Sequence, residues 1–419
     1  MSQTSLLSPY GLLGKTLGHS YSPEIHKALG NAAYTLFERS PHELAQFLAQ
    51  PDLKGLNVTI PYKQTVMSAC QSISDAAKRI GCVNTMIRQA DNSWYGHNTD
   101  YDGFIFLLQR AHITVAHKKV LILGDGATSH TVHIALDDLG AREIIHLSRK
   151  TAPFYEDAPQ HSEDTDIIIN TTPVGMYPHC PSQLITLANF TKLSGVVDVV
   201  YNPYRTALLI EAEQRGIPYS DGLPMLVGQA VAAATLFQNK TFGPDEADTI
   251  ITKLRQQQEN IILIGMPGVG KTTVGQALAA RLKRPLIDCD EEFEKRYSHP
   301  GNYIATYGEP AFREKETALL QELCKTTGTI IATGGGIVTR PENYPILRQN
   351  GRIYWIRRPL ERLATDNRPL SQGGLQRLEE LYTIRQPLYE TFSQYSLDFA
   401  TPEEGAQRIE EEYYAHFNS

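Results

Sequence analysis

The stretch that most constrains the fold is NIILIGMPGVGKTTVGQAL, residues 260–278. It is typical of a strand, a glycine-rich turn and a helix, and Gly265, Gly270, Lys271 and Thr272 complete the pattern G-x-x-x-x-G-K-[ST]. Glycines leave room for a phosphate chain, which the backbone N–H groups and the helix N-terminus then face. We expect the lysine to reach the β- and γ-phosphates of ATP and the threonine hydroxyl to bind Mg²⁺. A P-loop fold usually begins with this strand, so the long chain before it needs a separate explanation.

Apolar runs recur along both halves of the chain and alternate with helical patterns. These runs are 119–124, 143–148, 166–170, 196–201, 260–265, 329–334 and 352–356. Short β-rich runs separated by amphipathic stretches predict an α/β fold with parallel sheets covered by helices. The most polar helical stretch, 244–260, ends directly before the P-loop strand. We therefore expect a domain boundary near residue 258.

The composition argues against several classes of protein. Hydrophobic residues make up 41% and charged residues 20% of the chain, as in ordinary globular proteins, and the net charge of −7 argues against a nucleic-acid partner. The five scattered cysteines form no C-x-x-C pair, which favours free thiols in a reducing cytoplasm. Neither a signal peptide nor an apolar stretch of about 20 residues is present, so no membrane partner is expected. Monomer and homo-oligomer both remain open.

Carboxylates and arginines follow the P-loop. Asp288 and Asp290 stand two apart at the end of the next predicted strand and are expected to point the same way, with Cys289 facing the core. One carboxylate could hold the metal's water shell, and the other could orient an acceptor hydroxyl. Arg313 and Glu316 stand at i and i+3 on a predicted helix. Such an arginine is more often a solvated surface charge than a ligand contact.

Over nearly all of 260–419 the chain resembles shikimate kinase. The resemblance is carried by D-x-D, YGEPAFREKE, the triple glycine of IIATGGGIV, DNRPLS and IRQPLYE, in this order. It implies that Lys271, Asp290 and Arg368 are catalytic, with Arg368 in a lid at about 360–375 and Arg362 as a further lid arginine. It implies these shikimate contacts: Asp290, Arg313, Gly335, Gly336 and Arg385. It implies these ATP contacts: Gly265, Gly268, Val269, Gly270, Lys271, Thr272, Thr273 and Arg368. Thr272 and Asp288 would hold Mg²⁺.

In the first half, polar residues recur where predicted strands turn into helices. Ser20 and Ser22 precede Pro23 and a helix, so they could bind a carboxylate, or Ser22 could simply cap the helix. Lys63 alone would be read as solvated surface. It rises above that reading because several polar residues occupy equivalent positions: Asn57, Thr59, Asn84 and Asp100.

Residues 118–150 predict a strand–helix–strand unit that binds a dinucleotide. Gly124 and Gly126 follow the first strand and open the helix, which by itself is weak evidence. The second strand ends in Ser148, Arg149 and Lys150. Basic residues at this point accommodate the 2′-phosphate of NADP, whereas an acidic residue is typical of NAD sites. The unit therefore favours NADP, although the basic pair could also be an ordinary solvated turn.

Over residues 8–258 the chain resembles shikimate dehydrogenase. The resemblance is carried by H-S-x-S-P, N-V-T-I-P-x-K, V-N-T, N-T-D, NTTPVGM, DVVYNPYRTALL and MLVGQA. It implies that Lys63 and Asp100 are the catalytic pair. It implies this substrate pocket: Ser20, Ser22, Asn57, Thr59, Asn84, Tyr201 and Gln229. It implies these NADP contacts: Gly124, Gly126, Ala127, Ser148, Arg149, Lys150, Thr172, Met176, Gly222 and Met225. Asp125 and Ala127 depart from the family's G-A-G-G-A turn, since Ala127 lacks glycine's freedom at positive φ.

Together the resemblances imply an enzyme with two consecutive activities. The first would reduce 3-dehydroshikimate to shikimate with NADPH, and the second would phosphorylate the 3-hydroxyl of shikimate with ATP. The expected domains are 1–100 with 223–258 for substrate, 101–222 as a Rossmann domain for NADP, and 260–419 as the kinase. One alternative is a kinase with a regulatory or catalytically weak dehydrogenase-like domain. Another is a quinate/shikimate dehydrogenase that uses NAD.

Overall fold

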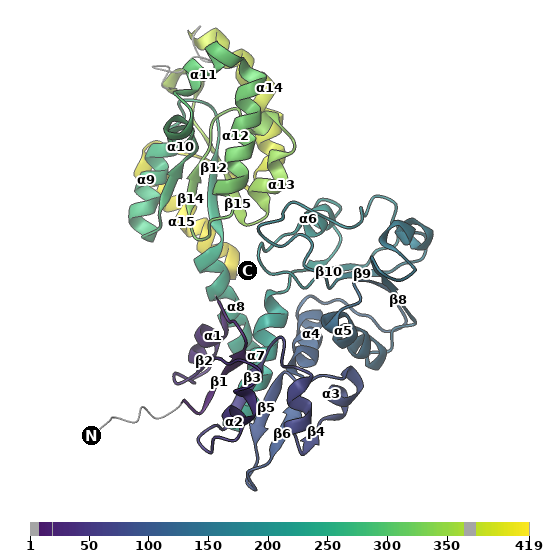
Figure 1. Cartoon of the computed structure of the whole chain (residues 1–419). Coiled ribbons are helices and arrows are strands. Elements are labelled where there is room, and N and C mark those ends of the chain that lie inside the picture. The colour runs from purple at the N-terminus through teal and green to yellow at the C-terminus, as the bar shows by residue number, and fades with distance from the viewer. Residues whose placement is uncertain (1–7, 19, 364–373, 419) are drawn as a thin grey trace, which may run out of the picture. The chain divides into compact units, whose positions relative to one another are not determined.

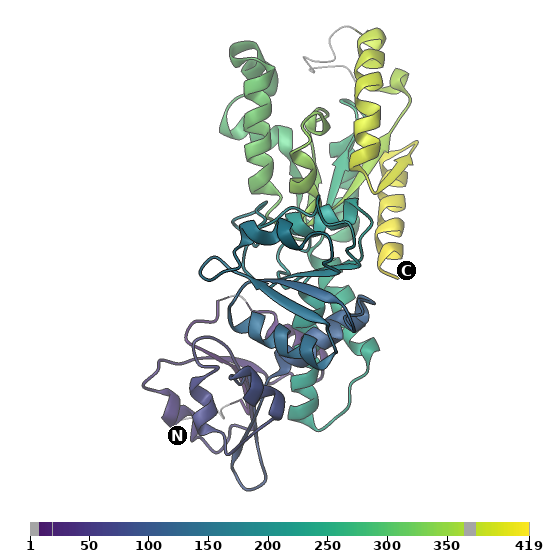
Figure 2. The same cartoon turned by 90° about the vertical axis from the view of Figure 1, so that its right-hand side faces the viewer.

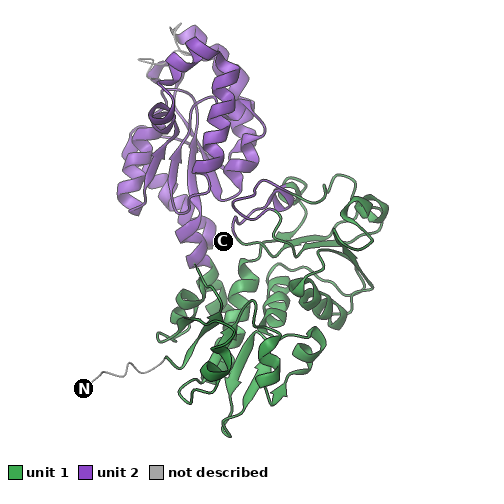
Figure 3. Ribbon diagram, viewed as in Figure 1, with its two compact units in different colours: residues 1–174, 183–201, 211–251 green, residues 175–182, 202–210, 252–419 purple. Residues whose placement is uncertain are grey.

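The computed structural model describes residues 8–18, 20–363 and 374–418 (Figures 1 and 2). The chain divides into two compact units (Figure 3). Unit 1 comprises residues 1–174, 183–201 and 211–251, and unit 2 comprises residues 175–182, 202–210 and 252–419. No helix in the described part of the chain is long and apolar enough to cross a membrane.

Unit 1 begins with a mixed six-stranded sheet in the order β2-β1-β3-β5-β6-β4. Its strands are β1 (Tyr10–Gly14), β2 (Thr35–Glu38), β3 (Gly55–Val58), β4 (Ser72–Ile73), β5 (Thr85–Arg88) and β6 (Trp94–His97). Its short helices are α1 (Ser22–Ala28), α2 (Leu44–Leu48) and α3 (Asp75–Ile80). Strands β1, β2 and β3 run parallel, while β5 is antiparallel to β3 and β6. Of the residues predicted for the substrate pocket, Ser20 and Ser22 thus lie at the start of α1, Asn57 and Thr59 at the end of β3, and Asn84 directly before β5.

The second sheet of unit 1 is entirely parallel, in the order β11-β10-β9-β7-β8. Its strands are β7 (Lys119–Leu123), β8 (Glu143–Leu147), β9 (Ile167–Asn170), β10 (Gly195–Asp198) and β11 (Tyr219–Ser220). The associated helices are α4 (Thr99–Arg110), α5 (Ala127–Asp138), α6 (Ala207–Gln214) and α7 (Leu223–Gln238). The four predicted strands are confirmed. Strand β10 ends before the predicted residue 201 because the Asp198 side chain accepts the N–H of Val200 and turns the chain.

Helices α4 and α7 pack closely in unit 1, and this contact positions the cavity described below. A side chain on Gly103 would put its Cβ 2.5 Å from the Met225 carbonyl oxygen, and one on Gly228 would lie 3.1 Å from the Gly103 Cα. The two glycines therefore let the helix backbones touch. As a result, Asp100 in the first turn of α4 and Gln229 on α7 face the same space.

Unit 2 holds a five-stranded parallel sheet in the order β13-β14-β12-β15-β16. The strands are β12 (Asn260–Ile264), β13 (Leu286–Asp288), β14 (Ile330–Ala332), β15 (Gly351–Arg357) and β16 (Tyr395–Asp398). The helices are α9 (Lys271–Leu282), α10 (Cys289–Arg296), α11 (Pro300–Tyr307), α12 (Glu309–Leu323), α13 (Asn343–Arg348), α14 (Gly374–Phe392) and α15 (Pro402–Asn418). They cover both faces of the sheet (Figures 1 and 2), so its central strands β12, β14 and β15 are almost wholly buried, as the apolar runs predicted, whereas the edge strands β13 and β16 are only partly buried.

The predicted helix at 244–260 is α8 (Pro244–Gln258), and only Glu259 separates it from β12. The division into compact units falls within α8, after Ile251. The α/β fold class with parallel sheets is confirmed in both units.

Candidate active sites

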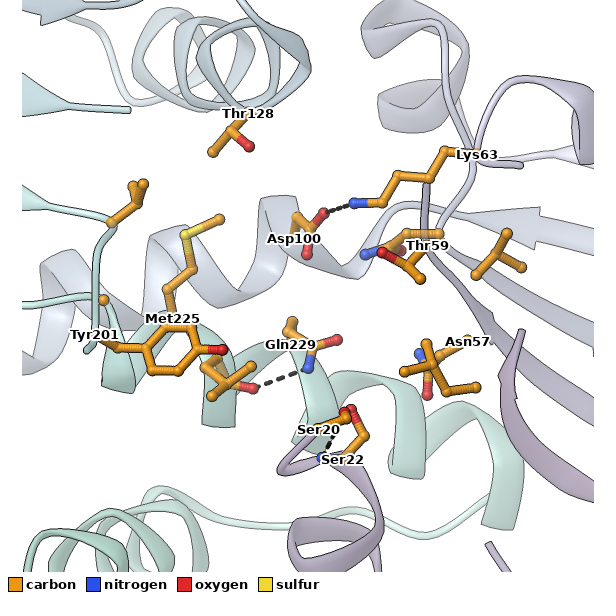
Figure 4. A pocket seen from close by; sticks show the side chains of 16 residues that line it. Ser20, Ser22, Asn57, Thr59, Lys63, Asp100, Thr128, Tyr201, Met225 and Gln229 are labelled. Atoms are coloured by element: carbon orange, nitrogen blue, oxygen red, sulfur yellow. Dashed lines mark hydrogen bonds and ion pairs between the residues drawn. The ribbon is translucent and has the colours of Figure 1, made fainter. Parts of the chain in front are cut away.

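Unit 1 contains a cavity of about 310 Å³ between its two sheets' helices and loops (Figure 4). Every residue predicted for the substrate pocket lines it, together with the predicted catalytic pair. The lining is Leu12, Ser20, Ser22, Asn57, Val58, Thr59, Lys63, Asn84, Asp100, Thr128, Val199, Tyr201, Gly222, Met225, Leu226 and Gln229. Residues far apart in the sequence therefore converge on one space. Five lining residues were not among the predicted site residues: Leu12, Val58, Thr128, Val199 and Leu226. Val58, Val199 and Leu226 lie within the motifs, but as apolar positions that no chemistry marks.

Lys63 and Asp100 form an ion pair inside this cavity. Lys63 Nζ lies 2.6 Å from Asp100 Oδ2, and about a quarter of each side chain is exposed. Burial acts to lower the pKa of Lys63, but the charge and hydrogen bond of Asp100 outweigh it and raise that pKa. Lys63 is therefore an ammonium at neutral pH, held by a carboxylate and open to a ligand. An ammonium held in this way can donate a proton to a bound ligand, unlike a lysine on the open surface.

The position of Asp100 is fixed by a buried cap. Asn98 is fully buried, and its Oδ1 accepts the Asp100 N–H at 3.1 Å at the start of α4. The Asn98 amide also donates to the Cys82 carbonyl oxygen at 3.2 Å. Asn84 Oδ1 accepts the N–H of Thr99, the first residue of α4, at 2.7 Å. Two asparagine side chains thus bind the free N–H groups at the helix start, as capping requires.

Ser20 and Ser22 lie at the start of α1, but Ser22 does not cap it. The helix begins at Ser22, its N-cap is Tyr21, and no side chain caps it. The alternative in which Ser22 caps the helix is therefore wrong, because Ser22 is already helical. Instead, Ser20 Oγ accepts the Ser22 N–H at 3.2 Å. Both hydroxyls line the cavity (Figure 4).

A buried histidine lies behind the cavity wall. His26 has no exposed surface, and its Nε2 lies 3.1 Å from Asn57 Oδ1. Burial lowers the pKa of His26 to about 4, although the Asn57 hydrogen bond opposes the shift. No local pattern marks Asn57 as the partner of His26, because only the fold brings α1 and β3 together.

We predict a pH dependence of stability from His26. In the unfolded chain its pKa is about 6.5, so between pH 6.5 and 4 the unfolded state binds a proton that the folded state does not. The free energy of unfolding of unit 1 should fall as pH drops through this window, by up to about 1.4 kcal/mol per pH unit. His26→Gln should remove this part of the slope. Urea titrations at several pH values, followed by Trp94 fluorescence in a Trp355→Phe background, measure it, and equal slopes would contradict the prediction.

The predicted dinucleotide turn connects β7 to α5. Gly124 has φ +125°, and a Cβ there would lie 2.6 Å from Thr171 Oγ1, so only glycine fits. Gly126 is the N-cap of α5, and Ala127 is its first residue. The concern that Ala127 needs positive φ is therefore wrong, because the position is helical. Asp125 is exposed at the turn.

The remaining predicted NADP residues follow other strands. Ser148 Oγ accepts the N–H groups of Lys150 and Thr151 at 3.1 and 3.0 Å, which folds the turn after β8 and leaves Arg149 and Lys150 exposed. Thr172 follows β9 and is 3.1 Å from a Cβ built on Gly124. Gly222 and Met225 line the cavity, whereas Met176 is 43% exposed in a segment of unit 2. Exposed basic groups beside a glycine turn and a helix N-terminus fit a phosphorylated dinucleotide.

In unit 2 the P-loop joins β12 to α9. Gly265 has φ +147°, and a Cβ there would lie 2.5 Å from the Ile356 carbonyl oxygen. Lys271 Nζ donates to the carbonyl oxygens of Gly265 and Met266 at 2.9 and 3.0 Å. Its charge is thereby held over the loop. The other predicted ATP residues take these positions: Gly268 and Val269 buried in the loop, Gly270 at the N-cap of α9, and Thr272 and Thr273 in its first turn.

The two aspartates after the P-loop do not share a strand face. Strand β13 ends at Asp288, whose side chain caps α10 by accepting the N–H groups of Asp290 and Glu291 at 2.9 and 3.3 Å. The expected period-two arrangement is wrong because Asp290 is already helical. Asp288 also accepts the Thr272 hydroxyl, so two oxygen ligands converge as Mg²⁺ requires. Cys289 is buried in the core, as predicted.

The arginines predicted to contact shikimate are buried rather than solvated. Arg313 and Arg385 are 7% and 4% exposed. Arg313 Nη1 lies 2.6 Å from Glu316 Oε2, and burial raises the pKa of Glu316 although Arg313 opposes this. Burial also lowers the pKa of Arg385, whose Nη1 donates to the Gly335 carbonyl oxygen at 3.2 Å. The surface-charge reading is therefore wrong for both arginines.

The triple glycine lets these groups meet. A Cβ on Gly336 would lie 2.1 Å from the Arg313 guanidinium, and a Cβ on Gly334 would lie 3.1 Å from Asp290 Oδ1. The guanidinium, the carboxylate and the glycine backbone are thus neighbours in one site. Arg362 is exposed at the end of a short 3₁₀ turn. Arg368 lies outside the described residues.

The chain is similar to known shikimate dehydrogenases and to the shikimate kinase family, in agreement with the two sites described above. A shikimate dehydrogenase (NADP⁺) of Clostridium beijerinckii is 37% identical over 247 residues, which cover 55% of this chain and 91% of that protein. The chain belongs to the shikimate dehydrogenase family. Residues 12–86 match the family model of the shikimate dehydrogenase substrate binding domain. Residues 267–413 match the shikimate kinase family model, so the dehydrogenase is fused to a shikimate kinase domain.

Solved structures support the dehydrogenase assignment of the first part. A chorismate mutase/shikimate 5-dehydrogenase fusion protein from Clostridium acetobutylicum is 34% identical, with a TM-score of 0.55 over 58% of this chain and 96% of that one. Shikimate 5-dehydrogenase from Thermus thermophilus, solved with NADP(H) and shikimate, is 26% identical with a TM-score of 0.52. It covers 58% of this shikimate dehydrogenase–kinase chain and 98% of its own.

Proposed function

We propose that the chain is a bifunctional enzyme that reduces 3-dehydroshikimate with NADPH and phosphorylates the shikimate product with ATP. The observation that supports the proposal most is that each unit brings reactive groups of its own close together. Unit 1 holds the Lys63–Asp100 pair in a cavity, and unit 2 holds the P-loop lysine near buried arginines and an aspartate. The two reactions share an atom, because the hydroxyl oxygen made by the first is the acceptor of the second.

In the reductase, Lys63 supplies the proton. NADPH, when bound, supplies the hydride for the C3 carbonyl of 3-dehydroshikimate. Negative charge develops on the carbonyl oxygen during this reaction, and an ammonium in a partly buried cavity stabilises that charge and protonates the oxygen. Asp100 holds Lys63 in place and keeps it protonated. Ser20, Ser22 and the other polar lining residues would hold the carboxylate and hydroxyls of the substrate.

In the kinase, charged groups at fixed positions would supply most of the stabilisation of the transition state. Mg²⁺-ATP, when bound, supplies the phosphoryl group, and Thr272 and Asp288 fit the cation. Lys271 would balance charge on the β- and γ-phosphates, as would Arg368 from the lid. Arg313 and Arg385 would clamp the shikimate carboxylate, which suits the fork geometry of guanidinium groups. Asp290 would orient the 3-hydroxyl and accept its proton.

The clamp gives a prediction for the kinase. Arg385→Lys should raise the KM for shikimate about tenfold or more and leave the KM for ATP unchanged, since an ammonium cannot replace a planar fork. Arg377→Lys is the matched control, because Arg377 lies on the same helix in an exposed pair with Glu380. Steady-state kinetics with each substrate varied measure both constants. An equal rise in both KM values would place Arg385 elsewhere.

The alternatives make different predictions for the cofactor. Consumption of NADPH rather than NADH with 3-dehydroshikimate would support the proposal and the role of Arg149 and Lys150. Preference for NADH would support a quinate/shikimate dehydrogenase that uses NAD. No oxidation of either, with kinase activity intact, would support a kinase with a regulatory dehydrogenase-like unit. The intact Lys63–Asp100 pair argues against this last case.

We also propose the domain division predicted from the sequence. Residues 1–100 with 223–258 would bind substrate, 101–222 would bind NADP, and 260–419 would be the kinase with its lid at about 360–375. Each proposed domain contains one complete sheet, within 10–97, 119–220 and 260–398, which supports the division. All five cysteines are free thiols, which supports a cytoplasmic location.

A further inference from the structure

A pair of stacked rings lies directly behind the cavity wall of unit 1. His26 on α1 and Tyr34, just before β2, have ring centroids 3.9 Å apart and planes inclined by 7°. Their exposed fractions are 0% and 5%, and neither ring lines the cavity. Neither residue lies in the motifs that carry the family resemblance. We therefore infer the role of the pair from its contacts.

Both rings direct a hydrogen atom at the same acceptor. His26 Nε2 lies 3.1 Å and the Tyr34 hydroxyl 2.8 Å from Oδ1 of Asn57, a cavity residue. An amide oxygen has two lone pairs, so these two donors occupy its accepting capacity. His26 has to be the neutral Nε2–H tautomer to do this. Its buried Nδ1 has no hydrogen-bond partner among the described residues, which agrees with an unprotonated nitrogen there.

The other end of the Asn57 amide is fixed independently. Asn57 Nδ2 donates to Thr85 Oγ1 at 3.0 Å, and the Thr85 hydroxyl donates to Asn84 Oδ1 at 3.1 Å. Because Thr85 gives its proton to Asn84, it has to accept from Asn57. The amide therefore cannot flip without breaking hydrogen bonds at both ends, and such bonds are costly to lose in a buried site. One N–H of Asn57 remains for a ligand.

We propose that His26 and Tyr34 are positioning residues that make Asn57 a hydrogen-bond donor, and not an acceptor, toward the substrate. The cavity then recognises an oxygen lone pair of a substrate hydroxyl at this point. A hydroxyl that could only donate here would find no acceptor on Asn57. The inference rests on the proposed reductase function and names a specificity determinant that lies outside the cavity.

The test removes the two donors in the full chain while keeping the packing. Tyr34→Phe deletes one oxygen and keeps the ring, and His26→Leu removes the other donor. The double variant should raise the KM for 3-dehydroshikimate about tenfold or more, because the amide can then flip. Its kcat should change less than about threefold, and the KM for NADPH should stay constant. Replacing His26→Leu by His26→Gln in the double variant, which keeps an N–H donor at this position, should restore most of the affinity for 3-dehydroshikimate.

A second set of variants, made in an Asn57→Ala background, distinguishes positioning of Asn57 from a general structural role of the two rings. In Asn57→Ala, the same two substitutions should raise the KM for 3-dehydroshikimate at least threefold less than in the original background, because their effect through Asn57 is lost and only the contact of Tyr34 with Ser22 is still removed. An equal rise of KM in both backgrounds would overturn the inference, as would an unchanged KM in the original one. If the double variant does not fold, the same comparison of KM values is made with Tyr34→Phe alone in both backgrounds. Unchanged kinase activity would show that each variant is folded in unit 2. If the unaltered chain does not oxidise NADPH, the proposed function itself fails, and the inference fails with it.

Discussion

Lys63→Ala should lower the reductase kcat about 10³-fold and leave phosphoryl transfer unchanged. The substitution removes the cation that stabilises the developing oxyanion and the proton that neutralises it, and such groups contribute about 10²–10⁴-fold. It also leaves Asp100 without its partner in the cavity, so a second negative charge would face the transition state. NADPH oxidation with 3-dehydroshikimate and ATP consumption with shikimate, measured on the same preparation, give both rates.

The matched control for this variant is Lys78→Ala. Lys78 is an exposed lysine on α3, paired with the exposed Asp75, and lies outside the cavity. Its loss should change neither activity. A fall of less than tenfold in Lys63→Ala would show that another group donates the proton. A large fall in kinase activity would show that the two units are coupled energetically.

Lys271→Ala should have the converse effect, with a kinase kcat reduced about 10³-fold and normal NADPH oxidation. Lys271 is the buried cation over the P-loop, held by two loop carbonyl oxygens, and no other residue of that loop carries positive charge. Without it the developing charge on the transferring phosphate loses its preorganised partner. Because its amine also donates to the loop, ATP affinity should fall as well.

Lys295→Ala is the control for Lys271→Ala. Lys295 is an exposed lysine of α10 that pairs with Glu292, so its removal should leave kcat and the KM for ATP unchanged. Equal losses in both variants would point to a nonspecific effect of charge on unit 2. Retention of kinase activity in Lys271→Ala would contradict the P-loop assignment.

Much of the fold followed from local chemistry in the sequence. Strands buried on both faces read as continuous apolar runs, which is why β7 and β12 were predicted closely. Gly124 and Gly265 were recognisable because their backbone conformations and close neighbours exclude other residues. The motifs also pointed to side chains that the structure brings together, since a strand end followed by a helix fixes where a polar residue can lie.

What the sequence missed depends on partners distant in the chain. Asp290 was expected on a strand, but capping by Asp288 starts the helix earlier. The burial of Arg313 and Arg385 requires the glycine backbone of residues 334–336 as a neighbour. His26 has its partner Asn57 on another element, and no local pattern marks such a contact.

The most direct test of the bifunctional account follows one labelled molecule through both reactions. The unaltered chain is incubated with 3-dehydroshikimate, NADPH deuterated on the transferred position, ATP and Mg²⁺, and the products are analysed by mass spectrometry. The account predicts shikimate 3-phosphate that carries one deuterium at C3 and one phosphate on the adjoining oxygen. Phosphorylation of added shikimate without any deuterated product would contradict it, because the chain would then be a kinase alone.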